Sequence, residues 1–246
     1  MALPVLHASP LVDYPDTDGL PMAESDFQLY PLLHAVMVLR LYFQERADVY
    51  VAGNLFIYYE EGNREAVIAP DVFVVIGTPK RDRSSYFLWR EPKGPDFVLE
   101  ITSQSTRSRD QAEKPSIYAR LGVREYFQYD PTGDYLVPHL QGFRLIAGVY
   151  QPMAATGVPA GVLILHSEVL GLDLRLEDGA LRFYDPATDQ GFPTYAEAVQ
   201  AQRQAEERAR QEAVLRQAAE ARMAELEARL QVFQATRPPG APREGV

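Results

Sequence analysis

Hydrophobic residues follow two different periods along the chain, and each period predicts a different kind of element. Residues 29–45 place apolar side chains at helical spacings of three and four, which predicts a helix. Residues 49–59 alternate apolar and polar positions around a turn-like Gly53–Asn54 pair, which predicts strands. The unbroken apolar run at 72–76 and the run at 97–101, which is apolar except for Glu100, are typical of buried strands of a sheet.

The second half of the globular region continues with helix and strand patterns in alternation. A helical pattern ends at Gly122, a residue suited to the left-handed conformation that terminates many helices, and residues 125–129 then predict a strand. Further strands are expected at 143–149 and 161–165. The Asp178–Gly179 pair lies between two alternating segments and predicts a β-hairpin.

Beyond this hairpin the composition changes abruptly. Residues 194–235 contain no glycine or proline and are dominated by Ala, Glu, Gln and Arg, which predicts one long helix. Met223, Leu226, Leu230 and Phe233 form a heptad seam in its C-terminal third, which favours a coiled coil or a dimerising helix there. Upstream, the same heptad positions hold polar residues and alanines, which favours a solvated helix.

These patterns divide the chain into four regions. Residues 1–25 are rich in Pro, Asp and Gly without a period and predict an extended arm, and residues 26–193 predict the globular domain. The long helix follows at 194–235, and residues 236–246 are expected to form a disordered tail.

Composition excludes several classes of chemistry. The 246 residues include no cysteine, so disulfides, thiol nucleophiles and cysteine zinc sites are excluded, and the four histidines show no paired spacing. Any metal should therefore be held by oxygen atoms. No apolar run approaches the roughly 18 to 20 residues that span a bilayer, and the N-terminus lacks the pattern of a secretory signal. We expect a soluble, cytoplasmic protein with no membrane partner.

The net charge of −10 argues against indiscriminate binding of nucleic acid, but the charge is unevenly distributed. Residues 80–125 hold 10 basic and 7 acidic residues, a net charge of +3, whereas the residues before them carry −8. This basic segment is either a chance cluster on a solvated face or the part of the protein that meets a polyanion.

Two carboxylates occur where a fold has little structural use for them. Asp71 opens the first apolar run, and Glu100 lies inside the second, between strand-forming residues. Burying a carboxylate costs several kcal/mol unless it is paired or bound to a metal. Asp71 could instead end a turn, and Glu100 could be salt-bridged at a strand end, so each residue alone also fits a structural role.

A lysine on the next predicted helix joins this pair. Strand alternation places Glu100 and Thr102 on one face. Lys114 shares an apolar stripe with Ile117, Tyr118 and Leu121, which directs it toward the sheet. Its compact ammonium would approach a water or a phosphate as a point charge. The alternative is a lysine whose stem covers apolar surface while its charge stays in water. Tyr118 itself is expected to pack in the core.

Four segments in this order, 69–77, 95–106, 110–118 and 122–131, closely resemble the Uma-type restriction endonuclease family of the PD-(D/E)XK superfamily. The similarity runs from about residue 14 to residue 184. It implies an α/β (α+β) fold with a restriction-endonuclease-like core, in which helices flank a central mixed β-sheet, together with a divalent metal and phosphodiester hydrolysis. Thr102 stands where the superfamily's strand motif has lysine, and many family members carry the lysine on the helix. Pro115 departs from the family and would kink the helix or restart it.

The residues and the resemblance together predict a Mg²⁺-dependent DNA endonuclease, with Mn²⁺ as a substitute ion. Asp71, Glu100 and the backbone carbonyl of Ile101 would hold the metal, and Lys114 would orient the attacking water or neutralise developing charge. Candidate phosphate contacts are Arg107, Arg109 and Gln111.

The rival hypothesis is a catalytically inactive binding or scaffold protein that keeps the fold and forms an oligomer, such as a dimer, through its C-terminal helix. A nuclease acting on RNA, or on branched or single-stranded DNA, is a third reading that the sequence does not separate from the first.

Overall fold

A computed structural model describes residues 12–17, 25–102, 113–155 and 162–235. The chain divides into two compact units, Met1–Phe192 and Pro193–Val246. Three sheets and two α-helices make up the described part of the first unit, and one long helix makes up the described part of the second. The expected disordered tail at 236–246 lies outside the described residues.

The central sheet of the first unit has six strands in the order β1-β4-β6-β7-β8-β9. These strands are β1 (Val49–Gly53), β4 (Val72–Ile76), β6 (Phe97–Ile101), β7 (Glu125–Tyr129), β8 (Leu140–Ile146) and β9 (Val149–Pro152). A three-stranded sheet has β2 (Ile57–Tyr58) between β3 (Val67–Ile68) and β5 (Tyr86–Phe87). A four-stranded sheet has, in order, β10 (Leu163–Ser167), β11 (Leu172–Glu177), β12 (Ala180–Asp185) and β13 (Gln190–Gly191). The helices are α1 (Asp26–Tyr42), a short 3-10 helix η1 (Leu88–Arg90), α3 (Lys114–Leu121) and α4 (Tyr195–Ala235).

The central sheet is mixed because one of its strand pairs is parallel. β6 and β7 run parallel, with Phe97 opposite Glu125 and Ile101 opposite Tyr129, whereas the other pairs of this sheet are antiparallel. A parallel pair needs a crossover connection, and α3 lies in it. The predicted fold class, a mixed sheet flanked by helices with a long C-terminal helix, is confirmed.

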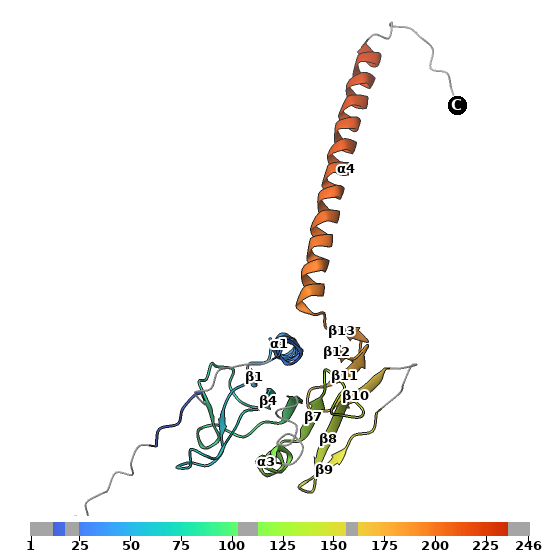
Figure 1. The fold of residues 1–246 in the computed structure, drawn as a ribbon. Helices are drawn as coiled ribbons and strands as arrows, with labels where there is room; N and C mark the ends of the chain where they lie inside the picture. Colours follow the sequence, from blue (N-terminus) through green and yellow to red (C-terminus); the bar gives the residue numbers. More distant parts are fainter. Residues whose placement is uncertain (1–11, 18–24, 103–112, 156–161, 236–246) are drawn as a thin grey trace, which may run out of the picture. The chain divides into compact units, whose positions relative to one another are not determined.

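Two apolar cores lie on the two faces of the central sheet, and α1 and α3 lie on opposite faces (Figure 1). Phe97, Leu99 and Ile101 of β6 belong to the core that contains α1 and part of the four-stranded sheet. Val98, between them, belongs to the core that contains Tyr118 of α3 and part of the three-stranded sheet. Since side chains alternate along a strand, Glu100 points to the same face as Val98.

One strand prediction is wrong. The segment 143–149, expected as one strand, contains the turn between β8 and β9. Ala147 and Gly148 both have positive φ angles, 50° and 82°, which reverses the chain in two residues. The hairpin predicted at Asp178–Gly179 forms between β11 and β12, and these two residues also have positive φ angles, 49° and 81°.

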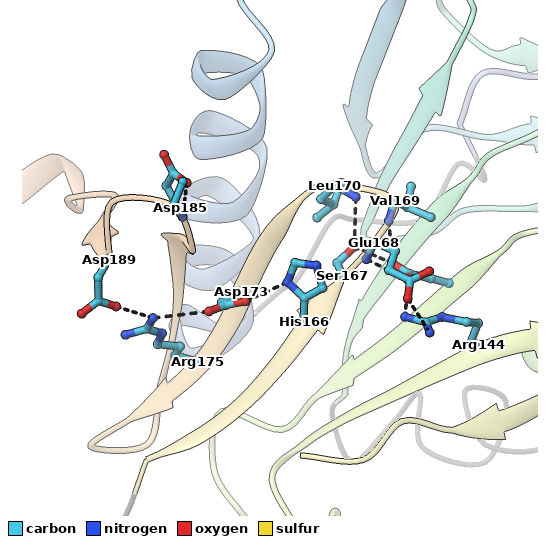
Figure 2. Close-up of polar contacts among 12 residues, drawn as sticks. Arg144, His166, Ser167, Glu168, Val169, Leu170, Asp173, Arg175, Asp185 and Asp189 are labelled. Atoms are coloured by element: carbon cyan, nitrogen blue, oxygen red, sulfur yellow. Dashed lines mark hydrogen bonds and ion pairs between the residues drawn. The ribbon is translucent and has the colours of Figure 1, made fainter. Parts of the chain in front are cut away.

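A buried polar network joins the four-stranded sheet to the central sheet. Glu125, at the start of β7, is 1% exposed and accepts hydrogen bonds from Ser167 Oγ at 2.5 Å and from the backbone N–H of Glu168 at 3.0 Å. Figure 2 shows that Arg144 of β8 pairs with Glu168, and that the hydroxyl of Ser167 also accepts a hydrogen bond from the N–H of Leu170.

A second chain of polar contacts crosses the four-stranded sheet itself (Figure 2). His166 Nδ1 lies 2.9 Å from Asp173 Oδ1, and Arg175 contacts Asp173 at 3.3 Å and Asp189 at 2.5 Å. These contacts link β10, β11 and the turn before β13. They stabilise this sheet rather than the segment that carries the candidate site.

The helix α4 begins with a reciprocal cap. Thr194 Oγ1 accepts a hydrogen bond from the N–H of Glu197, and the Glu197 carboxylate accepts one from the N–H of Thr194. None of its residues is buried, and all except Val199 are exposed. Among the helices of the described residues, none combines the length and the apolarity needed to cross a bilayer.

Candidate active site

Asp71 lies at the point where the chain enters β4. Because β4 runs antiparallel to β6, with Val72 opposite Leu99, the start of β4 adjoins the end of β6. The Asp71 carboxylate accepts a hydrogen bond from the backbone N–H of Ile101 at 2.6 Å. This contact brings Asp71 next to the strand residue that follows Glu100.

The backbone around Asp71 is tightly packed. The carbonyl oxygens of Pro70 and Asp71 accept hydrogen bonds from the N–H of Asn54 at 3.1 and 3.2 Å. A Cβ atom at Gly53 would lie only 2.8 Å from the Asp71 carbonyl oxygen and 2.8 Å from a methyl group of Val36. A glycine at position 53 therefore allows β1 to approach the residue that carries the first carboxylate.

Glu100 is completely buried in β6, and its two carboxylate oxygens have different partners. Oε2 accepts a hydrogen bond from Lys114 Nζ at 2.8 Å, and Oε1 accepts a short one from the hydroxyl of Tyr118. The ion pair and the hydrogen bond offset the cost of removing this carboxylate from water. Glu100 is therefore ion-paired, as expected for a carboxylate with a structural role. Its partner is Lys114, the lysine that the sequence predicts to act in catalysis.

Lys114 and Tyr118, which bond to Glu100, lie within the first five residues of α3. The helix begins at Lys114, and Pro115 occupies its first turn, where no intrahelical hydrogen bond to its nitrogen is needed. Pro115 is therefore accommodated at the start of α3, and Lys114 and Tyr118 lie four residues apart on one face. The choice between a kinked and a restarted helix depends on residues 103–112, which lie outside the described residues. The Lys114 side chain is 13% exposed, with its ammonium on Glu100 rather than in solvent.

Tyr118 is the residue whose role the sequence did not reveal. It was expected in the core, and it is indeed buried, but its hydroxyl also bonds to Glu100. Burial, and next the charge of Glu100, hold the pKa of Tyr118 well above its ordinary value, and the charge of Asp71 contributes in the same direction. The only available signal was the four-residue spacing from Lys114 on the face that meets Glu100.

The donor set fits a hard divalent cation. Asp71 and Glu100 offer carboxylate oxygens and Ile101 a carbonyl, and Mg²⁺ typically binds one or two carboxylates while keeping water and phosphate oxygens. Within the part of the chain that the structure describes, there is no group of three or more His, Asp or Glu side chains that could hold a metal ion. Among the described residues, the hydroxyl of Thr102, buried just beyond Glu100 and Ile101, has no hydrogen-bond partner, so this end of β6 has a further oxygen not satisfied by them.

The structure brings the predicted residues Asp71, Glu100, Ile101 and Lys114 together at one end of β6. The predicted phosphate contacts Arg107, Arg109 and Gln111 lie outside the described residues. They belong to the segment that joins β6 to α3, and their roles stay predictions.

Comparison with known proteins gives a match to one protein family. A family model, Uma2, described as “Putative restriction endonuclease”, matches residues 19–177 and so includes every residue of this site. The crystal structure of a protein from Anabaena variabilis, titled “putative nuclease”, is similar over 57% of this chain and 75% of its own, with 17% identity and a TM-score of 0.41. No curated protein matches. The resemblance found in the sequence is confirmed at the level of the family.

Proposed function

Because the chain belongs to the Uma2 family, we propose that it is a divalent-metal-dependent endonuclease that hydrolyses phosphodiester bonds of DNA. The observation that carries this proposal is the convergence of Asp71, Glu100 and Lys114 at one end of β6. We assign the catalytic unit to residues 26–193, with the arm 1–25 before it and the long helix 194–235 after it.

In this proposal Asp71, Glu100 and the carbonyl of Ile101 hold the ion, with Mg²⁺ as the physiological metal and Mn²⁺ as a substitute. A bound ion of this kind supplies Lewis acidity: it polarises a phosphate oxygen and lowers the pKa of a water. The chain's own contribution is to present two carboxylates from neighbouring antiparallel strands, one of them held by the Ile101 N–H and the other by α3.

Lys114 supplies the positive charge next to the carboxylates. Its ammonium, now on Glu100, is positioned to orient the attacking water or to neutralise charge that develops on the phosphate. We further propose that Arg107, Arg109 and Gln111, in the link between β6 and α3, contact the DNA backbone. The protein's net charge of −10 predicts modest affinity for DNA that falls as salt rises.

The test is cleavage of a DNA panel by the purified protein with Mg²⁺ or Mn²⁺, alongside Asp71→Ala, Glu100→Gln and Lys114→Ala. Each substitution should lower the cleavage rate at least a hundredfold, an expectation scaled on the loss of a single electrostatic group from an active site. Lys93→Ala is a matched control, because Lys93 pairs with Asp96 and its side chain is 44% exposed. Cleavage that survives Glu100→Gln would eliminate this mechanism.

The rival function is a nuclease fold that binds or scaffolds without hydrolysis. It gains support from the Lys114–Glu100 ion pair, which satisfies the buried carboxylate without any metal. Calorimetric titration with Mn²⁺ separates the two functions, since a scaffold would show no binding that depends on Asp71 and Glu100. Including RNA and single-stranded DNA in the substrate panel tests the third reading.

We also propose that α4 joins two copies of the protein. Met223, Leu226 and Leu230, in its heptad seam, are 48–60% exposed in the described chain. In this heptad Glu220 and Glu227 occupy one flanking position, and Arg222 and Arg229 occupy the other. A parallel pair sets glutamate against arginine between copies, whereas an antiparallel pair sets like charges together.

The charge pattern therefore favours a parallel dimer. Ending the chain at Phe192 should convert the dimer to a monomer in solution and leave cleavage largely intact. A truncated protein that is still a dimer would remove the assembly role of α4.

A further inference from the structure

The hydroxyl of Tyr118 occupies a position that packing alone does not require. Its ring lies 5.4 Å from the ring of Tyr126 and belongs to the core between α3 and the central sheet, so a phenylalanine would supply the same apolar contacts. The hydroxyl, by contrast, reaches into the strand face and donates to Glu100 Oε1. In a region lined by apolar side chains, this contact fixes the orientation of the carboxylate.

The two carboxylate oxygens of Glu100 are bound by different partners. Oε1 is held by Tyr118, whose buried ring cannot swing away, and Oε2 faces Lys114, whose flexible side chain keeps 13% exposure. A carboxylate with one oxygen fixed presents the other in a single direction. Without the Tyr118 hydroxyl, Oε1 would lose this donor, and the carboxylate would be less constrained in its rotation.

We propose that Tyr118 is a positioning residue for metal binding: its hydroxyl holds the Glu100 carboxylate in the orientation that directs Oε2 toward the ion shared with Asp71. The inference rests on the proposed function, because it assigns Glu100 as a metal ligand. Residues that orient metal ligands typically change metal affinity 10- to 100-fold when they are removed. Tyr118 acts through Glu100 and touches neither substrate nor ion.

The experiment compares two tyrosine-to-phenylalanine variants in the full-length protein. Tyr118→Phe removes the contact with Glu100. Tyr150→Phe is the matched control, because the hydroxyl of the partly buried Tyr150 donates to the backbone carbonyl of Val123 at 2.8 Å rather than to a carboxylate of the site. Both variants lose one hydrogen-bonded hydroxyl and keep their rings, so melting of the metal-free proteins should show that both remain folded.

Calorimetric titration with Mn²⁺ then separates positioning from packing. We expect Tyr118→Phe to weaken Mn²⁺ binding roughly 10- to 100-fold and Tyr150→Phe to leave it within about twofold of the starting protein. In cleavage at saturating metal, Tyr118→Phe should lower kcat with little change in KM for DNA.

The outcomes are distinguishable. If the starting protein binds Mn²⁺ and Tyr118→Phe binds it equally well, the positioning role is overturned while the proposed metal site stands. If both phenylalanine variants weaken binding alike, the effect is one of packing, and the positioning role is overturned again. If the starting protein itself binds no Mn²⁺, the proposed function is wrong, and the positioning role of Tyr118 is wrong with it.

Discussion

The carboxylate of Glu125 offers a direct test of how the four-stranded sheet is attached to the central sheet. Four donors converge on it: Ser167 Oγ and the N–H of Val169 reach Oε2, at 2.5 and 3.3 Å, while the N–H of Glu168 and Arg144 Nη2 reach Oε1, at 3.0 and 3.2 Å. The side chain is about 1% exposed, so water cannot replace a donor that is lost. Glu125→Gln keeps the size of the side chain and removes its charge.

The expected loss follows from this geometry. A glutamine has one accepting oxygen and one amide nitrogen, so two of the four donors must face another donor whichever way the amide is turned. Turned toward Ser167, the amide nitrogen can donate to its hydroxyl, and the N–H of Val169 is left without an acceptor. Hydrogen bonds to a charged group contribute about 1.5–3 kcal/mol, and an unsatisfied buried donor costs about 1–3 kcal/mol. We therefore expect Glu125→Gln to lower the free energy of unfolding by about 3 kcal/mol.

Urea unfolding followed by circular dichroism measures this difference, and thermal melting should show a decrease in Tm of roughly 6–12 °C for a unit of this size. Glu168→Gln is the control: it breaks a 2.9 Å ion pair with Arg144, but the Glu168 side chain is 66% exposed. Such exposed pairs contribute about 1 kcal/mol or less. A loss below about 1 kcal/mol for Glu125→Gln, or one equal to that of the control, would refute the reasoning.

Three further predictions concern pH, backbone packing and assembly. Burial raises the pKa of Tyr86 to about 12, so this group contributes stability that is present below pH 10 and is lost between pH 10 and 12, by about 2.7 kcal/mol at 1.36 kcal/mol per pH unit. Tyr86→Phe removes the ionisable group, so the fall in unfolding free energy from pH 10 to pH 12 should be smaller in this variant by about 2.7 kcal/mol. Gly53→Ala should lower cleavage and cost about 1–3 kcal/mol, measured by urea unfolding, because its methyl group would meet the Asp71 carbonyl at 2.8 Å; an unchanged rate would show that β1 does not position that residue. Because the chain has no cysteine, Leu226→Cys should form a disulfide between copies on oxidation, whereas Ala228→Cys, on the outer face of the heptad, should not; equal cross-linking of both would exclude a parallel pair in register.

The elements that the sequence predicts well are those whose signal is local. The apolar runs of β4 and β6 and the left-handed Gly122 at the end of α3, with a φ of 74°, follow from residue types alone. The turn at Ala147 was not predicted because alanine carries no signal for a positive φ, and tertiary pairing of β8 with β9 imposes it.

The candidate site shows the same division. Asp71, Glu100 and Lys114 were identified because a charge in an apolar pattern is visible in the sequence itself. The hydroxyl contact of Tyr118 was not, because it depends on where α3 crosses β6, and no spacing along the chain gives that distance. The role of Glu125 in attaching the four-stranded sheet could not be predicted either, because it depends on a hydrogen bond from Ser167, which is 42 residues away in the sequence.

The ion pair between Lys114 and Glu100 also determines how metal binding relates to folding. Many small metal-binding domains are unfolded without their metal, because the free energy of metal binding is what stabilises the fold. Here the ammonium balances the buried carboxylate from within the chain. Under the proposed function, metal entry would be an exchange in which the ion displaces Lys114 from Glu100 or shares the carboxylate with it, and a chelator should stop cleavage while leaving the protein folded.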